Sequence, residues 1–149
     1  MAAQVVTDSG IFIAAVLTES YSVQARALIG YWKNNAIEII TPTLFRYELS
    51  AVIRKNVFRQ VISAEIASQA ITDLQILTHG LVFMLDENLL QRSYELAVKF
   101  LRANTYDSQY LAVAERLNCE FWTTDERLFN AIKNDFPLIR WLGNFSPTT

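Results

Sequence analysis

Short β-rich runs alternate with longer helical patterns along this chain, and no other feature of the sequence constrains the fold as strongly. The runs cover Gln4–Thr7, Ile37–Thr41, Leu81–Leu85, Glu120–Thr123 and Leu138–Trp141. The segments between them carry apolar residues at helical spacing. Strands that alternate with helices favour a mostly parallel sheet covered by helices on both faces. The sequence therefore predicts an α/β fold, a three-layer α/β/α sandwich.

The predicted helices fill the segments between these strands. They cover Ser22–Lys33, Thr43–Arg59, Ala64–Thr78, Glu87–Arg102, Tyr106–Leu117 and Glu126–Asn134, and a short helix follows Asp8. Pro42 is predicted to lead into a helix, and Ser63, Asp86 and Asp125 are predicted N-caps. The second and third helices of this series have no strand between them, so we expect a projecting helical hairpin that offers a surface to a substrate or partner.

The composition places the chain among globular domains. Of its 149 residues 52% are hydrophobic and 19% are charged, and no stretch is rich in linker residues, so we expect a single domain over residues 1–149. The apolar stretch Gly10–Thr18 is shorter than the ~20 residues that span a bilayer. The lone Cys119 is typical of a buried thiol in a reducing compartment. We therefore expect a cytoplasmic protein that does not enter a membrane.

The charge balance limits how the chain could bind nucleic acid. Its formal net charge is −2, whereas proteins that coat nucleic acids are usually basic overall. Any nucleic acid would have to be held locally, through metal ions or a small basic patch. The candidate basic contacts are Arg54, Lys55, Arg59, Arg102 and Arg127.

Two of the apolar runs deliver a carboxylate at their C-terminal ends. Asp8 follows Thr7 directly, and Asp125 follows Thr123 and Thr124. Ligands bind at the carboxyl ends of strands in parallel α/β sheets, so two such ends indicate a shared anionic pocket. Each carboxylate also has a structural explanation, because Asp8 could form a turn and Asp125 could cap a helix.

Two further carboxylates lie on the apolar faces of predicted helices. On a helical wheel Glu48 falls between Leu44 and Val52, and Asp107 lies on the stripe of Tyr110. An ionised side chain rarely faces a core unless it is paired, hydrogen-bonded or bound to metal. The structural alternatives are a buried ion pair for Glu48 and an interaction with the helix dipole for Asp107.

Convergence of these four carboxylates would require a positive partner. Two carboxylates about 5 Å apart repel by roughly 3 kcal/mol at an effective dielectric of ~20. Carboxylate oxygens without His or Cys favour hard cations, so Mg²⁺ or Mn²⁺ is the expected ion and zinc is disfavoured. The single histidine, His79, stands beside Gly80 at a predicted helix end, where a capping role explains it better than metal ligation.

Four segments that carry these acids occur in a recognisable order over almost the whole chain. They are Asp8-Ser9, Pro42–Leu49, Tyr106–Glu115 and Thr123–Leu128. Together they resemble the PIN-domain family, particularly the toxin ribonucleases of bacterial toxin–antitoxin pairs. One position departs from the family pattern, because Gly10 stands where the family often has Ser, Thr or Asn.

The resemblance implies a Rossmann-like sheet of order 3-2-1-4-5 and metal-dependent cleavage of RNA. Asp8, Glu48, Asp107 and Asp125 would be the acidic quartet that holds one or two Mg²⁺ or Mn²⁺ ions, and Thr123 and Ser9 would support it. The ions would activate water for attack on phosphate, and either Glu48 or Asp125 would position that water. The resemblance also implies a homodimer and a neutralising antitoxin protein.

Three other functions compete with this hypothesis. An aspartyl-phosphate phosphohydrolase usually needs a second acid two residues after the first, and Gly10 does not supply it. Hydrolysis of nucleotides by a P-loop requires a glycine-rich loop that the four glycines of the chain do not form. The main alternative is a catalytically inactive module of the same fold that binds protein or RNA.

Overall fold

The computed structural model describes residues 2–147 and contains a five-stranded sheet in which every pair of neighbouring strands is parallel. The strands are β1 (Gln4–Thr7), β2 (Glu38–Pro42), β3 (Val82–Met84), β4 (Glu120–Thr123) and β5 (Ile139–Trp141). Their order is β3-β2-β1-β4-β5, so β1 lies at the centre. The predicted fold class and strand order are confirmed.

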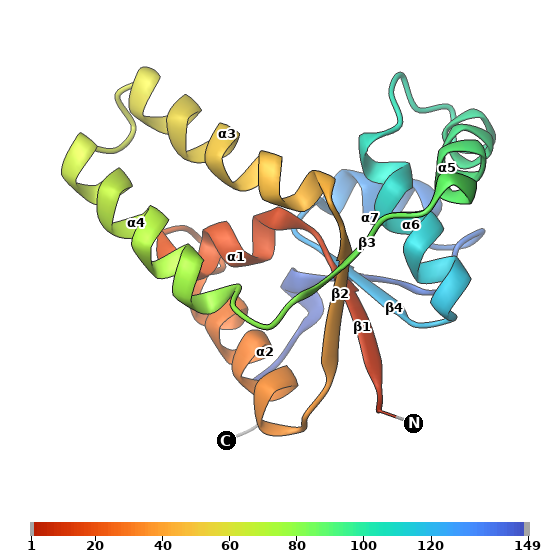
Figure 1. The fold of residues 1–149 in the computed structure, drawn as a ribbon, viewed down its shortest axis with the longest axis horizontal. Helices are drawn as coiled ribbons and strands as arrows, with labels where there is room; N and C mark the ends of the chain where they lie inside the picture. Colours follow the sequence, from red (N-terminus) through yellow and green to blue (C-terminus); the bar gives the residue numbers. More distant parts are fainter. Residues whose placement is uncertain (1, 148–149) are drawn as a thin grey trace.

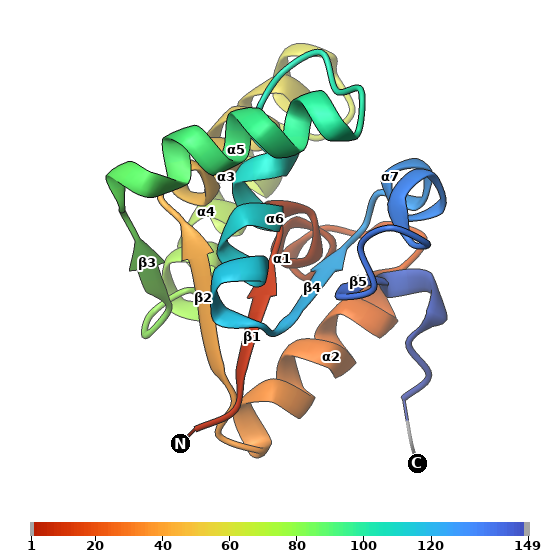
Figure 2. The same cartoon turned by 90° about the vertical axis from the view of Figure 1, so that its right-hand side faces the viewer.

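Helices cover both faces of this sheet (Figure 1). They are α1 (Ser9–Val16), α2 (Ser22–Asn34), α3 (Leu44–Phe58), α4 (Ala64–Leu77), α5 (Glu87–Lys99), α6 (Tyr106–Leu117) and α7 (Glu126–Ile132), and a 3-10 turn covers Leu142–Asn144. The first four lie on one face, and α6 packs on the central strands from the other face with α5 against it. The three-layer arrangement places the start of α1, α3 and α7 at the carboxyl end of the sheet (Figure 2).

The predicted hairpin is confirmed, because α3 and α4 run side by side and project from the body of the molecule (Figure 1). Helix α3 buries Phe45, Leu49 and Ile53 on one face. Gln60 turns the chain between the two helices with a φ of 61°, in the left-handed region. The opposite face of α3 stays in contact with solvent.

Local backbone chemistry accounts for the differences from the predicted boundaries. Pro42 is the last residue of β2 and is buried, and α3 begins at Leu44, one residue later than the predicted start at Thr43. Helix α5 ends at Lys99 and not at Arg102, because Leu101 has a left-handed φ of 54°.

Cys119 is half-buried, and this burial raises the pKa of its thiol to about 11. Among the helices of residues 2–147, none has the length and apolar character needed to cross a membrane.

Candidate metal and catalytic site

Both strand-end aspartates cap the helices that follow them. Asp8 comes directly after β1, and its Oδ1 accepts a hydrogen bond from the Ile11 amide at 3.2 Å. Asp125 follows β4, and its Oδ1 accepts from the Leu128 amide at 3.0 Å. Because β1 and β4 are parallel neighbours, these two caps lie at the same edge of the sheet. The capping role that the sequence predicts for Asp125 is confirmed.

Thr123 joins the two strand ends. Its hydroxyl donates to Asp8 Oδ2 at 2.6 Å and accepts from the Asp125 amide at 3.0 Å. The Thr124 amide donates a further hydrogen bond to Asp8 Oδ2 at 3.2 Å. Thr123 itself is only 1% exposed, so this bridge is shielded from competing water. The ends of β1 and β4 therefore form one hydrogen-bonded unit.

Burial raises the pKa of Asp8 to about 6, and the nearby charge of Glu48 adds to this effect. The hydrogen bonds from Thr123, Thr124 and Ile11 act in the opposite direction, because they stabilise the charged form. Three hydrogen-bond donors thus stabilise the charged form of Asp8, whereas burial and the charge of Glu48 destabilise it.

Glu48 reaches the same region from α3. The Tyr110 hydroxyl on α6 donates a hydrogen bond to Glu48 Oε1. Burial raises the pKa of Glu48, and the Asp107 charge raises it further, while the hydrogen bond from Tyr110 lowers it. Tyr110 is 2% exposed, and its ring stacks on Phe121 at 5.6 Å between centroids. Its phenol pKa is raised by burial and by Glu48.

Asp107 lies at the rim of the core and not inside it. Its side chain is 41% exposed, which corrects the inward orientation that the helical wheel predicts. Arg102, in the loop before α6, approaches Asp107 Oδ2 at 3.5 Å. Burial raises the pKa of Asp107, Arg102 opposes this shift, and the charge of Asp125 reinforces it.

The charges of the four predicted acids act on one another in sequence, and we call this set the acidic row: Glu48 raises the pKa of Asp8, Asp107 raises the pKa of Glu48, and Asp125 raises the pKa of Asp107. They come from β1, α3, α6 and the end of β4, so the fold brings distant segments to one edge of the sheet. Within residues 2–147, however, no three His, Cys, Asp or Glu side chains lie close enough together to hold one metal ion as they stand.

The structure explains why position 10 departs from the family pattern. A Cβ atom at Gly10 would lie 2.2 Å from the Thr124 hydroxyl oxygen, so the Thr124 side chain occupies the space that a side chain at position 10 would need. The neighbouring Ser9 is buried, and its hydroxyl lies beside the Tyr110 phenol.

Sequence reasoning missed two contributors to this region, Tyr110 and Thr124. Tyr110 was assigned to the core, although its polar oxygen on the stripe of Asp107 was a usable signal. Nothing in the sequence marked the contact between Thr124 and Gly10, because it joins residues more than a hundred positions apart.

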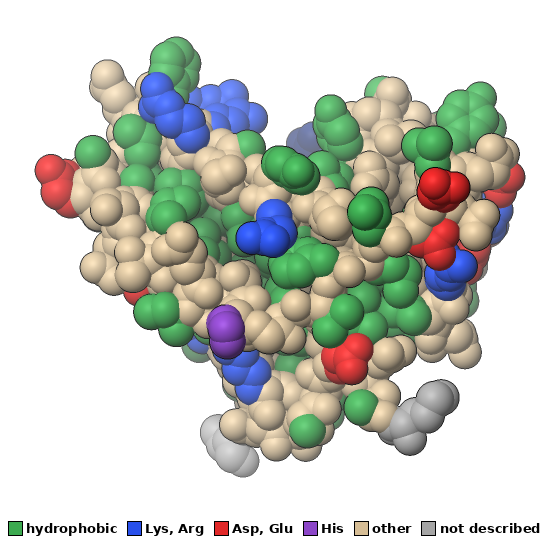
Figure 3. All heavy atoms as spheres, viewed as in Figure 1, with side chains coloured by type: hydrophobic (Ala, Val, Ile, Leu, Met, Phe, Trp, Pro, Cys, Tyr) green, Lys and Arg blue, Asp and Glu red, His purple; other side chains and the backbone are tan. Residues whose placement is uncertain are grey.

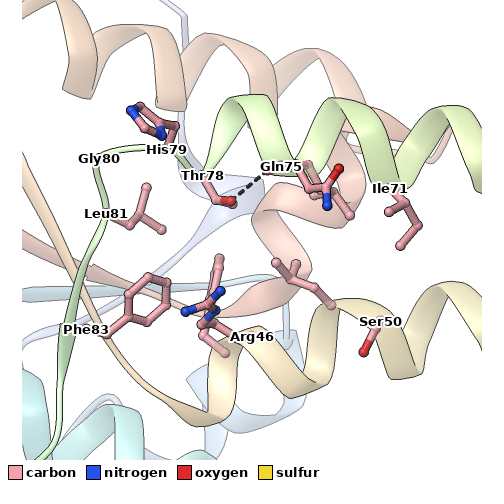
Figure 4. A pocket seen from close by; sticks show the side chains of 12 residues that line it. Arg46, Ser50, Ile71, Gln75, Thr78, His79, Gly80, Leu81 and Phe83 are labelled. Carbon is pink, nitrogen blue, oxygen red and sulfur yellow. Dashed lines mark hydrogen bonds between the residues drawn. The ribbon is translucent and has the colours of Figure 1, made fainter.

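The remaining basic candidates lie on the hairpin and on α7. Arg54, Lys55 and Arg59 are exposed on the hairpin, and Arg127 is exposed on α7. His79 lines a cavity of about 450 Å³ between α3, α4 and β3, in which the Arg46 guanidinium lies 5.2 Å from the centre of the Phe83 ring (Figure 4). The lining of this cavity includes none of the four acids.

Comparisons with known proteins agree with the fold. The sequence model of the PIN domain matches residues 5–134. Among solved structures, the crystal structure of PAE2754 from Pyrobaculum aerophilum is similar, with 18% sequence identity and a TM-score of 0.68 over 96% of this chain and 93% of that chain. No curated protein matches the sequence. Since the family match covers most of the chain and includes β1, α3, α6 and β4, the protein belongs to the PIN domain family.

Proposed function

We propose that this protein is a metal-dependent ribonuclease that hydrolyses RNA phosphodiester bonds. PIN domains are typically nucleases, and this chain carries an acid at each position that the resemblance implies: Asp8, Glu48, Asp107 and Asp125. The single observation that carries the proposal is Asp8, a carboxylate held by three hydrogen bonds at the end of the central strand, with a pKa raised to about 6 by burial and by the charge of Glu48.

The donor set fits a hard divalent cation. All four groups are carboxylates, and burial together with mutual repulsion raises the pKa of Asp8, Glu48 and Asp107. A cation would offset this unfavourable charge. Mg²⁺ or Mn²⁺ would be held by Asp8 and Asp107 with support from Asp125 and Glu48, whose side chains must draw together to do so. When bound, the ion supplies a Lewis acid that lowers the pKa of a water molecule and neutralises charge on the phosphate.

The roles of the protein groups follow from their contacts. Thr123 fixes Asp8 Oδ2, and Tyr110 fixes one oxygen of Glu48. We assign the positioning of water and the removal of its proton to Glu48, because burial raises the pKa of Glu48 toward the range that suits a general base. We assign support of the ion to Asp125, whose Oδ1 also caps α7.

RNA cleavage by the purified protein tests this function. We expect fragments of a single-stranded RNA to appear with Mn²⁺ or Mg²⁺ and to be absent with EDTA. Asp8→Asn and Asp107→Asn should abolish cleavage. The matched control is Asp73→Asn, which makes the same change at a partly exposed acid on α4 that accepts a hydrogen bond from the Gln69 side chain. Equal cleavage by Asp8→Asn and the wild type would overturn the proposal.

The alternative function is a catalytically inactive module of the PIN fold that binds RNA or protein. Two observations favour it: Arg102 already pairs with Asp107, and among the described residues no three acids stand close enough to hold an ion. Titration with Mn²⁺ separates the two functions. A nuclease should gain melting temperature with the logarithm of the Mn²⁺ concentration above its Kd, and Asp8→Asn should lose this gain. An inactive module should show no gain.

The resemblance also leads us to propose a cytoplasmic toxin that forms a homodimer and is neutralised by an antitoxin protein. An exposed apolar stripe on α5, formed by Leu90, Tyr94 and Val98 at four-residue spacing, supports a protein contact there. Sedimentation of the purified chain tests the dimer, and copurification with a small neighbouring protein tests the antitoxin. A monomer that sediments identically after Tyr94→Ser would contradict the α5 contact.

A further inference from the structure

We propose that the outer face of α3 binds single-stranded RNA and leads it to the acidic row. The identity of this RNA as a substrate rests on the proposed function, whereas the binding itself does not. The inference rests on exposed basic and aromatic side chains that lie along α3 beyond Glu48, toward the outer end of the projecting hairpin.

The helical repeat places these residues in two rows on α3, one beside the buried stripe and one opposite it. Glu48, Lys55 and Arg59 follow one another at i, i+7 and i+11 and fall within about 40° on the helical wheel. Tyr47, Arg54 and Phe58 repeat the same spacing in an adjacent row. The buried stripe consists of Phe45, Leu49 and Ile53. A ligand that leaves Glu48 along α3 therefore meets both rows.

The basic side chains of these rows are free to meet an anion. Arg54, Lys55 and Arg59 are all exposed, and none of them forms an ion pair within the described part of the chain. Four arginines elsewhere, by contrast, are paired with carboxylates: Arg92, Arg102, Arg116 and Arg140. In a chain of net charge −2, three unpaired cations within six residues make a local positive patch, which attracts phosphate groups.

The aromatic side chains favour RNA that is single-stranded. Tyr47 is 74% exposed and Phe58 is 75% exposed. The Arg54 guanidinium lies 5.6 Å from the centre of the Phe58 ring, so charge and ring form one platform. Basic and hydrophobic side chains lie together at the outer end of the hairpin in Figure 3. Exposed rings stack on unpaired bases, whereas bases in a duplex already stack on one another.

The length of the surface also suits a short strand. Eleven residues separate Glu48 from Arg59, which corresponds to about 16 Å along the helix axis. This distance matches about four or five stacked nucleotides at ~3.4 Å each. The α3 surface therefore has room for nucleotides on one side of a scissile phosphate placed at Glu48.

Fluorescence anisotropy with a labelled 12-nucleotide oligouridine tests this proposal. Measurements in EDTA separate binding from cleavage, and an RNA duplex of the same length serves as the competing ligand. Lys55→Gln/Arg59→Gln should weaken binding at least about tenfold at low salt and lower the slope of log K against log salt by about 1.4. Phe58→Ala should weaken binding by about 5- to 150-fold.

The matched control is Lys99→Gln/Lys133→Gln, which removes the same charge from exposed positions on α5 and after α7. This control should stay within about twofold of the wild type. Equal weakening by both double variants, or equal affinity for duplex and single strand, would overturn the proposal. Unchanged RNA binding with a lowered sedimentation coefficient in the α3 variants would also overturn it, because α3 would then be a protein interface. An oligouridine complex that depends on α3 without any Mn²⁺-dependent cleavage would leave the RNA surface standing and remove the nuclease.

Discussion

The ends of β1 and β4 have similar sequences and very different surroundings. Each strand ends in threonine, and each delivers an aspartate that caps the next helix. Asp8 is partly buried, receives three hydrogen bonds and has a pKa raised to about 6. Asp125 is exposed and receives one hydrogen bond at its side chain. The same short pattern thus produces a constrained carboxylate at one strand and an accessible one at the next.

The position of each strand in the sheet explains this difference. β1 is the central strand, flanked by β2 and β4, and α6 packs on it. β4 lies one strand nearer the edge. The capping role is therefore set by local sequence, whereas burial is set by the topology. A cation would relieve more unfavourable charge at Asp8 than at Asp125, and the two aspartates should respond differently to substitution.

The largest expected effect of this difference is on activity. Asp8→Asn should lower Mn²⁺-dependent RNA cleavage by more than about 100-fold, because it removes the most constrained of the proposed ligands. Asp125→Asn should lower it by about 10-fold, since this group is exposed and partly engaged as a cap. Initial rates at saturating Mn²⁺ measure both effects. Equal losses in the two variants would mean that burial does not distinguish the two strand ends.

The pH dependence of stability should reveal the raised pKa of Asp8. Because the pKa of Asp8 is about 6 in the folded state and 3.8 is the usual value, the folded protein binds this proton more tightly than the unfolded chain does. Without metal, the charged form should destabilise the fold by roughly 3 kcal/mol above pH 6, and this cost should vanish below pH 4.

Urea unfolding of the wild type and Asp8→Asn between pH 4 and pH 7 measures that cost. The free energy of unfolding of the wild type should fall relative to that of the variant as the pH rises through this range. Glu48 and Asp107 contribute in the same direction in both proteins, so the difference between the two curves reports Asp8 together with its coupling to Glu48. Parallel curves would contradict the assigned environment of Asp8.

These comparisons also show what could be predicted from the sequence. Strand periodicity and the order of the elements were sufficient for the sheet, and local capping chemistry was sufficient for Asp86 and Asp125. The contact from Tyr110 to Glu48 joins residues 62 positions apart, and it was not predictable from periodicity alone. The exposure of Asp107 was misjudged for a physical reason: an apolar stripe identifies the buried side of a helix but not where that side reaches the rim of the core.

A smaller effect should come from the steric contact between Gly10, which follows β1, and Thr124, which follows β4. Gly10→Ala should destabilise the protein by about 1–3 kcal/mol, because the new Cβ would meet the Thr124 hydroxyl at 2.2 Å. In a Thr124→Ala background the overlap with the hydroxyl is absent and only the contact with the Cβ of residue 124, at 3.2 Å, remains, so the same change should cost clearly less. Thermal unfolding of the four proteins in this double-mutant cycle gives the coupling energy. Additive effects would show that the two side chains do not compete for space.

The smallest expected effect distinguishes the two roles of Asp125. Asp125→Ala removes the cap of α7 and should cost about 1 kcal/mol of stability, whereas Asp125→Ser keeps an oxygen that accepts the Leu128 amide and should cost less. Neither variant keeps the carboxylate, so both should lose the same share of RNA cleavage. Melting temperatures and initial rates together separate the roles. If serine restored activity along with stability, Asp125 would act only by capping the helix, and the metal at this edge of the sheet would depend on Asp8, Glu48 and Asp107.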